Sequence, residues 1–198
     1  MQADWEFEVG GDAPVIEVNW PGFVDLRLRP EDASRLPEAA QFPPLASVLR
    51  KLNAATSPVW TAKCDFFPSL APEEFDADEL DAPPESAACG MGCYIDLLPR
   101  SDRQWTLPAE IASDCEILCD RLYTFPLTCS RVDLVIRRAY LAPDATGPDS
   151  INVGITAYIT ACGPTPAGAE DILERALAAV AASVEAAWIS HPSATKLQ

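Results

Sequence analysis

The chain has 198 residues, which is long enough to bury a hydrophobic core without disulfides or a structural metal. It carries 30 Asp and Glu residues against 14 Lys and Arg residues, so its formal net charge is −16. Because a field of that sign repels phosphate backbones and anionic lipid surfaces, we expect neither nucleic acid nor a membrane as a partner.

The N-terminal part of the chain predicts a β-hairpin followed by a helix. Apolar and polar residues alternate over residues 5–9 and again over 16–20, and residues 10–14 between them have the composition of a turn. A further short strand is expected over 23–29. Apolar residues then recur at helical spacing over 43–54, which predicts the first helix.

The middle of the chain predicts two strands, an acidic loop and a helix. The strands cover residues 58–67 and 88–98, where side chains alternate between an apolar and a polar side. Residues 71–85 combine many carboxylates with prolines, which is typical of a loop on the surface. A helix with one apolar stripe is expected over 108–123.

The last third of the chain predicts two more strands and a long helix. Residues 131–137 alternate between two faces, and residues 151–162 do so without interruption, as in a strand that is buried on one side. An alanine-rich helix of about 22 residues then begins at Pro166.

These elements predict an α+β fold in which an antiparallel sheet carries helices on one face, because that packing buries every apolar stripe. The order strand, strand, helix occurs over about 58–123 and again over about 129–188, which suggests a duplicated unit. No linker divides the chain, so residues 1–190 are expected to form one domain and residues 191–198 a flexible tail.

The candidate functional surface is the polar face of this sheet. Asp25, Asp65, Asp96 and Asp133 each occupy the same point in an apolar, strand-like run. If the strands are neighbours, one surface collects the side chains of Asp65, Tyr94, Asp96, Arg131, Asp133, Arg137, Asn152, Thr156, Tyr158 and Thr160. Trp105 lies apart from it, in a polar turn with two arginines, and is a candidate anchor for a partner.

Three functional interpretations fit such a face, and a fourth gives it no function. With a single histidine and no nucleotide-binding motif, the chain favours a non-catalytic interaction or regulatory domain that binds another protein or a second copy of itself. The alternative is a domain that binds a small polar ligand, or an enzyme whose paired carboxylates act as acid and base. The plainest interpretation is a solvated face of cross-strand ion pairs.

The cysteines give no strong metal or redox signal. Cys89 and Cys93, and likewise Cys115 and Cys119, are four residues apart, which is not the spacing of a C-x-x-C motif. We expect buried thiols and no cofactor, with a zinc site only if the two pairs converge. Seven cysteines, an odd number, and the lack of a basic and apolar leader at the start of the chain predict a cytoplasmic protein.

Overall fold

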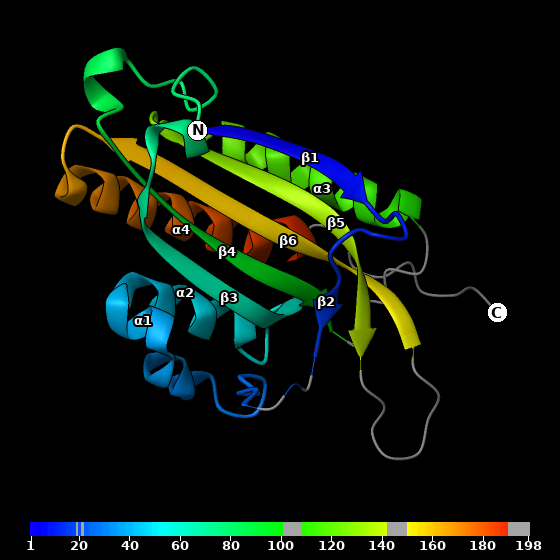
Figure 1. Cartoon of the computed structure of the whole chain (residues 1–198). Coiled ribbons are helices and arrows are strands. Elements are labelled where there is room, and N and C mark those ends of the chain that lie inside the picture. The colour runs from blue at the N-terminus through cyan, green and yellow to red at the C-terminus, as the bar shows by residue number, and fades with distance from the viewer. Residues whose placement is uncertain (19, 21, 101–107, 142–149, 190–198) are drawn as a thin grey trace.

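The computed structural model describes residues 1–18, 20, 22–100, 108–141 and 150–189. Within them, six strands form one mixed sheet in the order β1-β5-β6-β4-β3, with β2 beside β5 (Figure 1). The strands are β1 Gln2–Glu8, β2 Ile16–Glu17, β3 Val59–Leu70, β4 Cys89–Pro99, β5 Ser130–Leu141 and β6 Ser150–Gly163. The α+β class predicted from the sequence is therefore confirmed.

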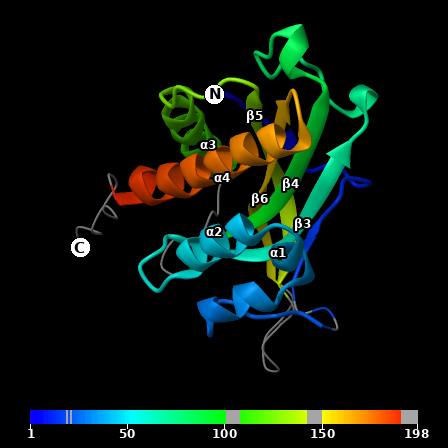
Figure 2. The same ribbon diagram turned by 90° about the vertical axis from the view of Figure 1, so that its left-hand side faces the viewer.

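The helices lie on one face of the sheet, as Figure 2 shows from the side. Helix α4 packs on β6, β4 and β5, α3 packs on β1 and β5, and α2 packs on β3. The helices are α1 Pro37–Gln41, α2 Pro43–Asn53, α3 Pro108–Tyr123 and α4 Pro166–Ile189, with shorter 3-10 turns at Pro30–Arg35, Pro72–Glu74 and Pro84–Ser86. Proline begins each of these helices because its missing N–H would have no partner there.

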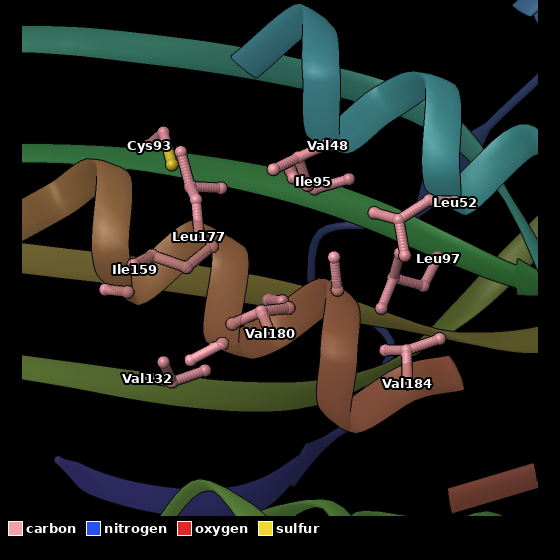
Figure 3. Close-up of a cluster of buried hydrophobic side chains, with 14 of the residues drawn as sticks. Val48, Leu52, Cys93, Ile95, Leu97, Val132, Ile159, Leu177, Val180 and Val184 are labelled. Carbon is pink, nitrogen blue, oxygen red and sulfur yellow. The ribbon is translucent and has the colours of Figure 1, made fainter. Parts of the chain in front are cut away.

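The main core lies between the helices and the sheet. Leu177 and Val180 of α4 meet Val48 of α2 over the strands, where Ile95 and Ile159 point toward them (Figure 3). All five side chains are buried, and each aliphatic side chain removed from water contributes about 1.5–3 kcal/mol of hydrophobic stabilisation. This core fixes which face of the sheet is covered by helices and which is left for other uses.

The prediction of a purely antiparallel sheet that begins with a hairpin is wrong. β1 and β2 each pair in parallel with β5, and residues 9–15 loop out of the sheet edge between them. Arg138 holds this loop by donating hydrogen bonds to the carbonyls of Gly10 and Gly11, at 2.6 and 3.2 Å. Alternation determines which face each side chain occupies but not the direction of the strand, so both pairings fit the same pattern.

Charge accounts for the parallel placement of β1. The register sets Glu8 opposite Arg137 and Asp4 opposite Asp133, with Asp4 within 3.7 Å of Arg131. Asp4 and Glu8 therefore lie near arginines of β5, whereas a hairpin would have paired β1 with residues 16–20, which contain Glu17 and no basic residue.

We call the sheet face opposite the helices the polar face, and part of it is covered near β2. There Ile16 and Val18 form a second, small core with Trp60, Ala62, Leu98 and Ala139, against which Phe23 packs. The prediction of a strand over 23–29 is wrong, because the chain turns there, with a turn at residues 26–28. The Asp25 carboxylate accepts hydrogen bonds from the Arg27 side chain at 2.7 and 2.8 Å. The Arg27 guanidinium lies 4.0 Å from the centre of the Trp60 ring.

The other end of the polar face is covered by residues 71–87, which we call the acidic segment (Figure 1). Its Leu80 and Ala82 are buried against Cys129 and Cys162, although the sequence predicted a simple surface loop. Phe75 lies so close to Gly90 that a Cβ atom built there would be 2.5 Å from the ring. Both ends of the polar face are therefore covered, and its middle is open.

Two further predictions concern how the chain is organised. The order strand, strand, helix does occur twice, as β3-β4-α3 and β5-β6-α4, but a duplication is not shown, because α3 packs on β1 and β5 whereas α4 packs mainly on β6. The expected tail, 191–198, lies outside the described residues, and the single domain over 1–190 stays a prediction.

Among the described helices, none has the length and apolar composition needed to cross a membrane.

Candidate functional site

The register places the predicted side chains in rows across the polar face. In one row, Asp133, Tyr158, Tyr94 and Asp65 lie on the successive strands β5, β6, β4 and β3. In the next row, Thr156 of β6 is opposite Asp96 of β4. Directly paired residues of neighbouring strands have Cβ atoms about 4.5–5.5 Å apart, so members of a row interact.

A depression of about 340 Å³ lies in the open middle of the polar face, and we call it the polar depression. Its floor contains five of the predicted site residues together with Lys63, and its wall comes from the chain around β2. The floor residues are Lys63, Tyr94, Asp96, Arg137, Thr156 and Tyr158, and the wall residues are Pro14, Val15, Ile16, Glu17 and Trp20. The polar face is therefore cupped at this point rather than flat.

A chain of hydrogen bonds connects the floor residues. Arg137 donates from one Nη atom to the Tyr158 hydroxyl at 2.9 Å and to Thr156 Oγ1 at 3.4 Å. Thr156 in turn donates to Asp96 Oδ1 at 2.6 Å. Arg137 Nε donates to Glu8 at 2.9 Å, and the second Nη atom also contacts that carboxylate. The positive charge of Arg137 is therefore paired with Glu8, while its remaining donors orient Tyr158 and Thr156.

Asp96 is the buried charge of this site. Its exposed fraction is 6%, and burial raises the pKa of its carboxyl to about 6, opposed by the Thr156 hydrogen bond and by the positive charges of Arg137 and Lys63. Within the described residues, Thr156 is the single hydrogen-bond donor to Asp96. A carboxylate held away from water with one donor is costly, and it attracts a cation or a further donor.

Two tyrosines lie beside Asp96 on the floor of the polar depression. The rings of Tyr94 and Tyr158 are 5.7 Å apart at an interplanar angle of 50°. Burial raises the pKa of Tyr94, and the neighbouring carboxylates Asp96 and Asp65 raise it further, so this phenol stays neutral. The guanidinium of Arg137 lies 5.4 Å from the centre of the Tyr158 ring. The floor thus combines aromatic surface with hydroxyl groups that can donate or accept.

Of the predicted residues that do not line the polar depression, Asp65, Arg131 and Asp133 have the most clearly defined contacts on the polar face. Arg131 donates to Asp133 at 2.7 Å and lies 3.7 Å from both Asp4 and Glu79, so it forms a surface ion-pair cluster. Asp65 is half-buried and accepts a hydrogen bond from its neighbouring backbone N–H at 2.8 Å. For these residues the solvated-face interpretation describes the geometry. Trp105 lies outside the described residues.

Glu8, Lys63 and the wall of the polar depression were not among the residues predicted from the sequence. Lys63 precedes Asp65 by two residues, so strand alternation, which puts both side chains on one side, was a usable signal. Glu8 alternates with apolar residues, but its expected partner was a hairpin strand instead of Arg137. Trp20 carried no local signal, since its role depends on where the chain runs after β2.

The cysteines lie where the hydrophobic interpretation expected them. All seven are unpaired, and five of them are buried. Burial raises the pKa of Cys64 to about 12 and that of Cys162 to about 11, which lowers the population of the reactive thiolate. Among the residues that the structure describes, no three His, Cys, Asp or Glu side chains gather in a way that would hold a metal ion.

No protein-family model matches this chain, and neither the curated proteins nor the solved structures gave a significant match.

Proposed function

We propose that this protein binds a small polar molecule in the polar depression. The observation that carries the proposal is the buried Asp96, held in a hydrogen-bond chain at the floor of a walled hollow. A fold of this size gains nothing in stability from a buried carboxylate that has one donor, because a well-packed apolar residue costs less there. A perturbed titratable group in a hollow is instead typical of a site that meets a ligand.

Two other functions from the sequence analysis stay open as predictions. An acid or base role would use the same carboxyl, since a group that titrates at about pH 6 exchanges its proton readily at neutral pH. A protein partner, or a second copy of the chain, would have to fit between the N-terminal wall and the acidic segment. That restriction supports a small ligand over a protein surface.

The remaining expectations concern partners and location. The net charge of −16 supports the absence of nucleic acid and of anionic membranes among the partners. Seven unpaired cysteines support a reducing compartment, and we propose the cytoplasm.

The test is a thermal-denaturation screen against a panel of polar metabolites, followed by NMR on the compounds that stabilise the protein. A ligand at 100 times its dissociation constant is expected to raise the melting temperature by about 5–10 °C. Its binding should shift backbone signals of residues 94–96 and 156–158.

Two isosteric variants locate the binding. Asp96→Asn is expected to lose the stabilisation by the ligand. Asp65→Asn, on the same face but outside the polar depression, is expected to keep it. If no compound stabilises the native protein, or if both variants behave alike, the proposal is wrong.

A further inference from the structure

A second hollow adjoins the polar depression. It has a volume of about 210 Å³ and lies at the outer edge of β3, against the start of α1. We call it the apolar hollow, because most of its lining is apolar, including Phe23, Val24, Leu26, Leu36, Leu49 and Cys64, while Glu38, Thr61 and Lys63 are its polar members. Its chemistry therefore differs from that of the polar depression, where charged and hydroxyl groups form the floor.

The two hollows meet at Lys63 and Trp20, which line both of them. The register of β3 against β4 shifts between Thr61 and Cys64, so that Lys63 lies in a β-bulge of the edge strand. The Lys63 side chain is exposed, and a long flexible side chain at an edge can move aside without disturbing the core. A single molecule can therefore occupy both hollows.

The charges in the polar depression favour a cation. Asp96 has one hydrogen-bond donor, and Glu17 adds a second carboxylate in the wall. The opposing charge of Arg137 is already paired with Glu8, and that of Lys63 is exposed to solvent, which screens it. The rings of Tyr94, Tyr158 and Trp20 line the same hollow, and aromatic faces attract ammonium groups.

We infer that the ligand is an amphipathic amine, whose ammonium group binds Asp96 among the aromatic rings and whose apolar arm extends past Lys63 and Trp20 into the apolar hollow. This inference rests on the proposed function and names the chemical class of its ligand. The carboxylate and the aromatic rings select the charge, and the adjoining hollow selects an arm of hydrocarbon or aryl character.

The experiment uses straight-chain alkylamines from propylamine to octylamine, with the alkyl carboxylates of the same lengths as charge controls. The reporter is the indole N–H signal of Trp20, which is assigned by its disappearance in Trp20→Phe. The amines are expected to shift this signal, with an affinity that rises about fourfold for each added methylene until the apolar hollow is filled. The carboxylates are expected to bind at least tenfold more weakly.

Three variants separate the two parts of the ligand. Asp96→Asn is expected to weaken every amine at least tenfold. Val24→Trp fills the apolar hollow from an exposed position and is expected to bring the affinity for octylamine down to that for propylamine. Leu28→Trp is the matched control, because Leu28 is 79% exposed and lines neither hollow, so the chain-length dependence should remain.

The outcomes distinguish this inference from the proposed function. If a metabolite of another class binds the polar depression while the amines do not, or if carboxylates bind as tightly as amines, the inference is wrong and the proposed function stands. An affinity that is independent of chain length also contradicts it. If neither the amines nor any panel compound binds, the proposed function fails as well.

Discussion

Asp96 is a buried carboxyl group that lowers the stability of the folded protein at neutral pH. Its folded pKa of about 6 lies above the value near 3.8 of an exposed aspartate, because burial disfavours the ionised form. Between these two values the folded state holds a proton that the unfolded state has released. The stability of the protein therefore falls as the pH rises from about 4 to about 6, and it stays lower above that range.

The substitution Asp96→Asn is predicted to stabilise the protein at neutral pH. The ionised carboxylate costs up to about 3 kcal/mol above pH 7, as the difference between the two pKa values implies, and asparagine has no such charge. Urea unfolding should show the variant more stable than the native chain at pH 7.5, with the difference shrinking toward pH 4. Asp65→Asn is the control and should change stability by less than about 1 kcal/mol. A difference that does not vary with pH would contradict this account.

Five of the site residues were predictable from the sequence because side chains two apart in a strand share a face. Tyr94 and Asp96, and likewise Thr156 and Tyr158, follow that rule, so their adjacency needed only the correct strand order. The rule failed at β3. The bulge after Thr61 places Trp60 and Ala62 in the small core of the polar face, whereas unbroken alternation would put them on the side of Phe66, which belongs to the main core.

At the scale of elements, the junction between α2 and β3 holds the bulge that carries Lys63. Asn53 at the end of α2 donates to Thr61 Oγ1 at 2.7 Å and accepts a hydrogen bond from the Thr61 N–H at 3.1 Å. Arg100 donates to the carbonyls of Asn53 and Ala54, each at 2.8 Å, so it satisfies groups that the helix end leaves unpaired. These bonds fix where β3 leaves its regular register.

Asn53→Ala is predicted to lower the free energy of unfolding by about 2–3 kcal/mol, because it leaves the buried N–H and hydroxyl of Thr61 without their partner. Chemical denaturation measures this loss. Arg50→Ala, on the exposed side of the same helix, is the control and should cost less than about 0.5 kcal/mol. Equal losses in the two variants would show that the junction contributes nothing of its own.

The direction of β1 and β2 could not be predicted from the sequence. Apolar and polar residues alternate over 5–9 and 16–20, and glycines separate the two runs. A hairpin has this pattern, and so do two short strands that pair one after the other with the same neighbouring strand, as β1 and β2 do with β5. The choice between them depends on partners far along the chain. Glu8 pairs with Arg137, and the Tyr123 hydroxyl of α3 donates to the Ala3 carbonyl at 2.6 Å. No local pattern contains that information.

For the whole molecule, the strong negative charge has an effect on stability that is separate from the site. A net charge of −16 on a chain of this length produces self-repulsion, which is greater in the compact state than in the unfolded chain. Salt screens this repulsion over distances of about 10 Å at 0.1 M. The compact state should therefore benefit from added salt.

The free energy of unfolding is predicted to rise between 20 and about 200 mM monovalent salt, because screening relieves the self-repulsion. Urea titrations at several ionic strengths measure the rise. Sodium and potassium chloride should act equally, since screening does not depend on the identity of the cation. A fall in stability, or a gain with one cation only, would contradict the prediction.

The parallel return of β2 to the edge that β1 occupies has one more consequence. Because the chain leaves and rejoins β5 in the same direction, residues 9–15 form an excursion that can lengthen or shorten without altering strand order or the packing of the helices. Pro14 and Val15, which border the polar depression, belong to that excursion. A change in the length of this loop would therefore reshape the wall of the polar depression and leave the scaffold as it is, which would alter ligand preference under the proposed function.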